Sequence, residues 1–286
     1  MTLAPATVAL SEAGRSTREG VLHLQFGVRG GRTVLTRDVQ KAPLMVVRPF
    51  ELPCGTLMAF VVNPTGGVLG GDHADIRVTV GEGARVLLLT QSATRVQPHP
   101  EGLEAVQDVQ FSVAEGGRLE YHPERTIPFA GSAFRQSVQV DVAEGAQFGM
   151  TESLAVGRVA MGERLQFRQY RSRVEVRLAG RPVALERVDL RPQEEALDVP
   201  GLLGGRAFSA SGVWVGGPDR VGRQDGTDGE DWPGVPGILA CGRNHAGAVW
   251  LRAAAERGPD LDAALTTARD ALRCSLFGAA PLRVRR

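Results

Sequence analysis

The sequence predicts a mainly β fold, a coiled or superhelical stack of β-hairpin modules with a small helical portion at the C-terminus. Three observations predict it. Runs with an apolar residue at every second position fill residues 20–215, a strand–turn–strand module occurs three times, and the last thirty residues contain one amphipathic helical pattern. The composition, with 36 glycines and 5% aromatic residues, is typical of a fold with many tight turns.

The predicted strands are short and bounded by Gly, Pro, Asp or Asn, which are the usual turn residues. Within the last run, Ala179-Gly180 lies between two alternating halves and predicts a hairpin. The clearest runs are VLHLQFGVR (21–29), RTVLTRDVQ (32–40), DIRVTV (75–80), RVLLLT (85–90), AVQDVQFSV (105–113), RQSVQVDV (135–142) and RVEVRLAGRPVALERVDL (173–190).

The repeated module has an alternating strand, a Glu-Gly turn and a second strand. The Glu-Gly pairs begin at positions 82, 115 and 144, so the separations are 33 and 29 residues. Similar units at such a period predict a stack in which each unit covers the apolar face of its neighbour. The alternative is a set of unrelated hairpins that share one turn chemistry.

We expect a single domain over residues 1–286, with three parts: a β-superhelical body (20–215), a flexible loop (216–237) and a final segment (238–286). The loop contains seven glycines and three prolines among charged residues. The final segment is too short to form an independent domain, and its run GAVWLRAA predicts one strand.

A helix follows this strand. Pro259 and Asp260 are start signals, and Gly278 is placed to end the helix. The apolar residues fall on one face at helical spacing, which predicts that this face packs on the sheet. They are Leu261, Leu265, Ala268, Leu272 and Leu276.

Charge and cysteine content exclude several classes of protein. A net charge of +1 gives no long-range field for nucleic acid or anionic lipid. The three cysteines are far apart and odd in number, which argues against a disulfide framework or a thiolate metal site and favours a reducing cytoplasm. No apolar run reaches the roughly 18 residues of a membrane span.

The segment NPTGGVLGGDHADI (63–76) is the richest in special residues. Asn63-Pro64 starts a turn, and the four glycines Gly66, Gly67, Gly70 and Gly71 precede Asp72. The lysine of a phosphate-binding loop is absent, and so is the GxGxxG order. Asp72 is therefore either a cap of the turn or a ligand.

Signatures of hydrolases, GxSxG and HExxH, are also absent. Asp72, Glu124 and Glu152 lie on or beside three different modules. If the modules stack, these carboxylates could line one interior, where oxygen ligands would suit a loosely held divalent ion. The alternative is that all three are surface acids.

The ordered motifs resemble those of the UreD family of urease accessory proteins, called UreH in some organisms. The resemblance rests on NPTGGVLGGD, on DIRVTVGEGARVLLLTQSATRVQP and on TESLAVGRVAMGE, and it covers about residues 20–190. It implies a non-catalytic scaffold with a β-superhelical body. It also implies partners: UreF, through it the GTPase UreG, and the urease apoprotein. Nickel would be held transiently, with no permanently bound cofactor.

By motif position, the family's acid after the second Gly-Gly pair falls on Asp72, and its acid before the Gly-Arg run falls on Glu152. The resemblance implies that both lie on a transient nickel route. One segment departs from the family pattern: Pro-Gln-Glu-Thr-Ile is replaced by a sequence in which the acid, Glu124, comes one place earlier. In a strand this shift sends the side chain to the opposite face, so we expect Glu124 to point away from the others.

Two further functions stay open on the residues alone. One is a β-solenoid carbohydrate-binding or adhesion protein, which predicts a secretory signal and exposed aromatic platforms. The other is a β-helical hydrolase or lyase that uses Asp72 with Glu152 and is active as an isolated chain.

Overall fold

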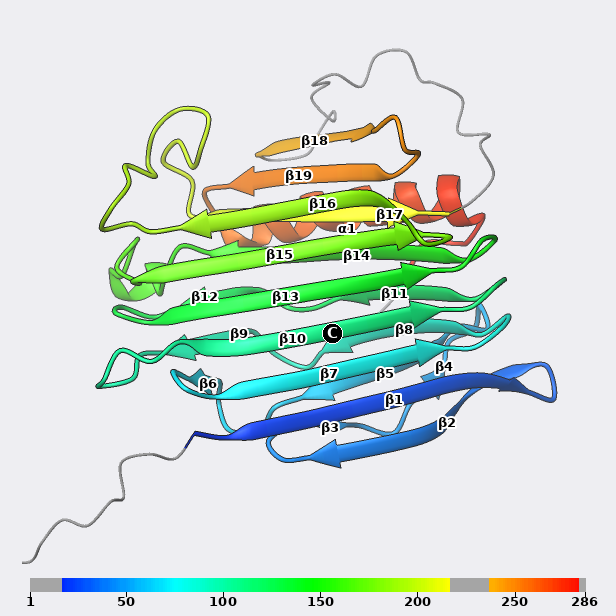
Figure 1. Cartoon of the computed structure of the whole chain (residues 1–286). Coiled ribbons are helices and arrows are strands. Elements are labelled where there is room, and N and C mark those ends of the chain that lie inside the picture. The colour runs from blue at the N-terminus through cyan, green and yellow to red at the C-terminus, as the bar shows by residue number, and fades with distance from the viewer. Residues whose placement is uncertain (1–16, 217–236, 283–286) are drawn as a thin grey trace, which may run out of the picture.

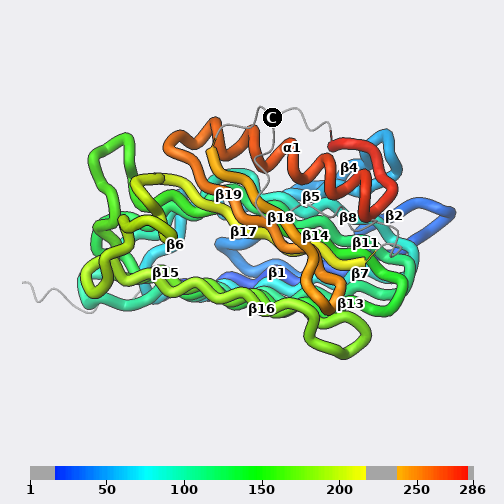
Figure 2. Tube along the Cα trace, turned by 90° about the horizontal axis from the view of Figure 1, so that it is seen from above, coloured from blue at the N-terminus to red at the C-terminus, as the bar shows by residue number. Residues whose placement is uncertain are grey.

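The computed structural model describes residues 17–216 and 237–282, and it confirms a mainly β fold with solenoid-like stacking (Figure 1). Two sheets lie face to face, and the helix α1 (Gly258–Phe277) lies on the outer side of one of them (Figure 2). The predicted flexible loop, 216–237, falls almost wholly outside the described residues. Within the described ranges, no helix is both long and apolar enough to cross a membrane.

Sheet A has seven strands in the described part of the chain. The five central strands run parallel, and an antiparallel hairpin strand closes each edge. In spatial order the strands are β16 (Arg181–Leu190), β15 (Gln169–Leu178), β13 (Ala133–Val142), β10 (Ala105–Val113), β7 (His73–Val80), β1 (Glu19–Arg29) and β2 (Arg32–Lys41).

Sheet B is larger and contains four main parallel strands, β14, β11, β8 and β5. Its long strands are β18 (Ile238–Arg243), β19 (Val249–Ala255), β17 (Phe208–Val215), β14 (Gln147–Ala155), β11 (Arg118–His122), β8 (Arg85–Thr90) and β5 (Leu57–Val62). Its short strands are β3 (Met45–Val46), β4 (Phe50–Glu51), β6 (Val68–Leu69), β9 (Thr94–Gln97) and β12 (Thr126–Pro128).

The three repeated modules are the strand pairs β7–β8, β10–β11 and β13–β14, and they stack as predicted. Their internal geometry differs from a hairpin, however, because the two strands of a module belong to different sheets and do not pair with each other. Each strand pairs instead with the equivalent strand of the next module. The physical reason is that both strands of a module are apolar on one face, and these faces can be buried only by lying opposite each other.

The Glu-Gly turns carry the chain from sheet A to sheet B. Gly83, Gly116 and Gly145 have φ of +64°, +66° and +73°, a conformation that glycine adopts without steric cost. Successive turns are linked by backbone hydrogen bonds, such as Arg118 N–H to Ala84 O at 2.8 Å. The regular glycine positions read from the sequence are therefore the corners of the stack.

The predicted hairpin at Ala179-Gly180 is confirmed between β15 and β16. Both turn residues have positive φ, +49° and +76°, as in a two-residue hairpin turn whose twist matches that of the strands. Gly30 and Gly31 form the equivalent turn between β1 and β2.

The main core lies between the sheets. Alternate residues of adjacent strands in sheet A form rows that point inward, and one row consists of Leu24, Val78, Phe111, Val140 and Val176, each no more than 1% exposed. Aromatic side chains of sheet B meet this row, and the ring centroids of Phe111 and Tyr121 are 4.9 Å apart.

The C-terminal segment continues sheet B with antiparallel strands. The predicted strand 247–254 corresponds to β19, whereas β18 was not predicted. The helix is confirmed: all five predicted apolar residues are buried, and Gly278 ends the helix in the left-handed conformation.

A buried ion pair holds this helix to the parallel body. Arg273 of α1 and Glu120 of β11 are each 1% exposed, and Arg273 Nε donates to the two carboxylate oxygens at 3.0 and 2.9 Å. Arg118 lies beside them, with its Nε 3.4 Å from Glu120 Oε1. Breaking such a pair is costly because it leaves a buried charge without its partner.

We predict that Arg273→Ala lowers the free energy of unfolding by about 3 kcal/mol, whereas Arg257→Ala, at an exposed arginine just before the same helix, costs under about 0.5 kcal/mol. Urea denaturation followed by circular dichroism measures both. Equal stabilities of the two variants would show that the ion pair does not anchor the helix.

Candidate functional site

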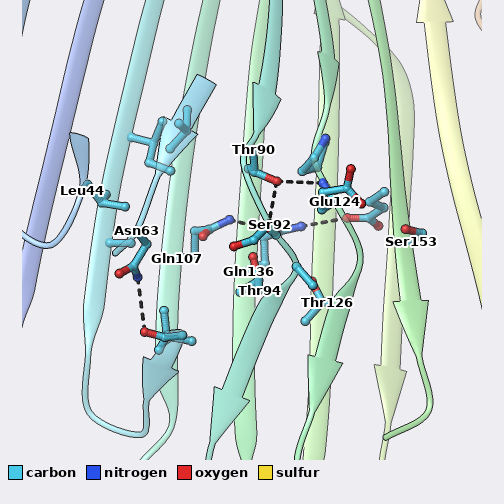
Figure 3. A pocket seen from close by; sticks show the side chains of 18 of the residues that line it. Leu44, Asn63, Thr90, Ser92, Thr94, Gln107, Glu124, Thr126, Gln136 and Ser153 are labelled. Carbon is cyan, nitrogen blue, oxygen red and sulfur yellow. Dashed lines mark hydrogen bonds between the residues drawn. The ribbon is translucent and has the colours of Figure 1, made fainter. Parts of the chain in front are cut away.

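Sheet B is interrupted along one line. Three strands each stop and are followed, after a break, by a short strand: residues 63–67 separate β5 from β6, residues 91–93 separate β8 from β9, and residues 123–125 separate β11 from β12. Beyond the breaks, the short strand β9 pairs with both β6 and β12. Behind the breaks lies a cavity of about 60 Å³ between the two sheets (Figure 3). Its polar lining residues are Asn63, Thr90, Ser92, Thr94, Gln107, Tyr121, Glu124, Thr126, Gln136, Glu152 and Ser153.

Glu152 extends from β14 into this cavity, where its carboxylate accepts hydrogen bonds from neutral donors. Gln136 Nε2 donates at 2.7 Å, Ser172 Oγ lies 3.1 and 3.0 Å from the two oxygens, and Ser211 Oγ lies at 3.2 Å. Two of these donors come from sheet A and one from the neighbouring strand of sheet B. The carboxylate thus bridges the two sheets.

The donors from sheet A form one row. Gln107, Gln136 and Ser172 are register partners on β10, β13 and β15, and they point inward at positions where the rest of the core is apolar. Gln107 Nε2 donates to Gln136 Oε1 at 2.9 Å, so a chain of hydrogen bonds runs from Gln107 through Gln136 to Glu152.

No arginine, lysine or histidine pairs with Glu152 among the described residues, so its negative charge has no counter-charge. Burial between the sheets is the largest influence and raises the pKa of the Glu152 carboxyl above its ordinary value of 4.5. The charge of Glu186 raises it further, while the Ser172, Ser211 and Gln136 donors lower it in part. A cation in the cavity would supply the missing charge.

Asp72 has a different environment. It is 6% exposed, and both of its oxygens accept backbone hydrogen bonds, one from Leu69 N–H at 2.9 Å and one from Arg18 N–H at 3.0 Å. Asp72 therefore caps its turn and ties the start of β1 to it. It is not among the residues that line the cavity, so the structure does not bring Asp72 and Glu152 together as a hydrolase pair.

The glycine-rich turn shapes one wall of the cavity. Asn63 Oδ1 accepts a hydrogen bond from Thr65 N–H at 3.0 Å, and Pro64 and Gly66 lie in the turn that follows. At Gly67 a Cβ atom would lie 2.3 Å from a backbone oxygen.

The second half of the same segment is equally tight. A Cβ atom at Gly70 would lie 2.2 Å from the Leu103 oxygen, and Gly71 adopts a φ of +91° immediately before Asp72. Glycine is required here for close approach of backbones.

Glu124 lines the cavity together with Glu152, contrary to the expectation that it points to the opposite face. The strand rule fails because β11 ends at His122 and Glu124 lies in the break that follows, where side chains no longer alternate. Gln107, Gln136, Ser172 and Ser211 were not predicted as site residues. Their signal in the sequence is a polar residue at an inward position of an alternating strand.

A groove of about 660 Å³ lies on the other side of the break, between sheet B and α1. Pro123, Glu124 and Ser153 line both the groove and the cavity and so form part of the wall between them. Arg125, next to them, donates to both oxygens of Asp262 of α1 at 2.7 and 2.6 Å, which fixes the loop to the helix.

The described residues contain no cluster of three His, Cys, Asp or Glu side chains arranged to hold a metal ion. Those that line the cavity include no histidine, cysteine or methionine, so its ligands are oxygen atoms of carboxylate, hydroxyl and amide groups. Such a donor set suits a cation that is held for a short time rather than a permanent metal centre.

Residues 18–286 match the family model described as UreD urease accessory protein. The chain is 56% identical over 273 residues to the urease accessory protein UreD of Deinococcus radiodurans, with 96% of each chain covered. It is 38% identical to the UreD of Herpetosiphon aurantiacus, and the match covers 68% of this chain and 67% of the relative. It is 33% identical to the UreD of Haloarcula marismortui, and this match covers 96% of this chain and 93% of the relative. The chain therefore belongs to the UreD family of urease accessory proteins.

Proposed function

We propose that the chain is a non-catalytic scaffold that assists delivery of Ni²⁺ to the urease apoprotein, in a complex with UreF and, through UreF, with UreG. Membership of an accessory-protein family supports a role in urease maturation. The observation that carries the nickel role is Glu152, a carboxylate between two sheets whose hydrogen-bond donors, within the described part of the chain, are all neutral.

The Glu152 carboxylate, held between the two sheets, meets the two demands of delivery. It attracts a divalent cation strongly because the surroundings have a low dielectric constant. It does not retain the cation permanently, because hydroxyl and amide oxygens are weak ligands for nickel compared with imidazole and thiolate. Glu124 and Ser153 line both the cavity and the outer groove, and the proposed route of the cation to Glu152 passes beside them.

We propose that Asp72 serves the same route indirectly. Its oxygens hold the glycine-rich turn, and Gly67 and Val68 of that turn line the cavity.

The proposed partners are supported by exposed apolar side chains, which partners would cover in the working complex. Met161, Leu185 and Leu202 are 72%, 61% and 60% exposed.

The first prediction concerns the charge of Glu152. Glu152→Gln keeps the shape of the side chain and removes its negative charge, so we expect urease matured with this variant to contain several-fold less nickel. Glu144→Gln, the same change in an exposed turn of the same module, should leave loading normal. Atomic absorption of purified urease measures both.

A pulldown with UreF in the same experiment tests whether the accessory complex still forms with each variant. Normal nickel content with Glu152→Gln, in a complex that forms normally, would refute the role of this carboxylate.

The second prediction concerns Asp72. Asp72→Asn can accept one of the two backbone hydrogen bonds but not both, so we expect a loss of stability of about 1–2 kcal/mol. Nickel loading should fall far less than with Glu152→Gln. Asp141→Asn, at an exposed position of β13, is the matched control. A loss of loading as large as that of Glu152→Gln, without loss of stability, would place Asp72 directly on the nickel route.

The third prediction is a pH dependence of stability. Because the pKa of Glu152 is raised in the folded protein, folding favours the protonated carboxyl. The resulting contribution to the free energy of unfolding is fully present below pH 4.5, the ordinary pKa of the group, and is lost as pH rises through its pKa in the folded protein. Glutamine does not titrate, so the stability of Glu152→Gln does not show this fall with pH. The melting temperature of this variant relative to wild type should therefore increase as pH rises above 4.5. A difference that is constant with pH would show that the carboxyl titrates normally.

A further inference from the structure

Gln136 is the residue on which the hydrogen bonds of the cavity converge. Its Nε2 donates to Glu152 at 2.7 Å and to Ser172 Oγ at 3.2 Å, and its Oε1 accepts from Gln107 Nε2 at 2.9 Å. It is 9% exposed and lies on the inward face of β13 (Figure 3). Glu152, to which it donates, lies on β14 of the other sheet. Among the described residues, Gln136 links Glu152 to both of its own neighbours in the row, Gln107 and Ser172.

These contacts fix which end of the amide faces the carboxylate. Because Gln107 donates to the oxygen of Gln136, the amide nitrogen is left to face Glu152. A cation beside Glu152 therefore meets N–H groups from this side and not a carbonyl oxygen. Gln136 fills a ligand position with a donor that a cation cannot use.

A carboxylate would fit at the same place with almost no change of shape. A glutamate at position 136 would lie within hydrogen-bond distance of Glu152, and two such carboxylates bind a divalent cation far more tightly than one, since affinity follows the number of charged ligands. Without a cation the pair could share one proton, so the fold need not be lost.

We propose that Gln136, oriented by Gln107, is a specificity-determining residue that keeps a second carboxylate away from the side of Glu152 that it faces, so that a divalent cation is held weakly enough to be passed on. This inference rests on the proposed function, because that function identifies the cation as Ni²⁺. It adds that weak binding is set by this side chain and is not a consequence of the cavity alone.

The test compares Gln136→Glu with Gln139→Glu, the same change three residues along β13 on the exposed outer face. Binding of Ni²⁺ alone to each purified chain is measured by equilibrium dialysis, and nickel loading of urease is followed over time with the complete accessory complex. We expect Gln136→Glu to bind Ni²⁺ on the order of ten-fold more tightly and to load urease more slowly. Gln139→Glu should change neither quantity.

If Gln136→Glu does not fold, as judged by circular dichroism, Gln107→Glu replaces it, because Gln107 also lines the cavity and does not contact Glu152. It should likewise bind Ni²⁺ more tightly and release it more slowly. Unchanged affinity in the folded variant, or tighter binding with normal loading, overturns the role of Gln136.

These outcomes are distinct from failure of the proposed function. Reduced loading with Glu152→Gln and unchanged affinity with Gln136→Glu would leave nickel delivery standing and remove only the role of Gln136. Normal loading with Glu152→Gln would remove the delivery role of the cavity itself.

Discussion

The in-register parallel stacking of the modules is the constraint on which the rest of this structure depends. Equivalent strands lie side by side, so a residue at a given position of one module becomes a neighbour of the equivalent residue in the next. Where these residues are apolar, as in the row that contains Phe111 and Val140, they form a continuous core. Where they are polar, as at Gln107, Gln136 and Ser172, they form a continuous polar surface.

A row of polar residues inside such a core lowers the stability of the fold, because amides, hydroxyls and carboxylates lose their hydration there. Here the cost is reduced by mutual hydrogen bonds, and Glu152 accepts them from three side chains, Gln136, Ser172 and Ser211. What the row does not supply is a positive charge. A carboxylate without a counter-charge therefore costs stability at this place, and the proposed nickel role gives it a purpose that stability does not.

The C-terminal helix completes the site from outside. Arg273 fixes its second half to β11 through a fully buried ion pair, and Asp262 fixes its first half to the loop at Arg125. The helix therefore forms one wall of the outer groove, while Pro123, Glu124 and Ser153 lie between that groove and the cavity. Access to Glu152 thus depends on residues that are more than 130 positions apart in sequence.

Local patterns determined much of this protein. The alternation of apolar residues gave the strands of the parallel body, the spacing of Glu-Gly pairs gave the stacking, and Leu261 to Leu276 gave the buried face of the helix. Glu152 was predicted as a site residue from its position in a family motif. Tertiary structure alone decided that the strands of each module lie in different sheets, because that depends on which apolar faces meet. It also decided that Asp72 caps a turn, that Glu124 joins the cavity at a break in the strands, and that Gln136 meets Glu152. Those contacts cross from one sheet to the other, and no periodicity along the chain records which residues face each other across a core.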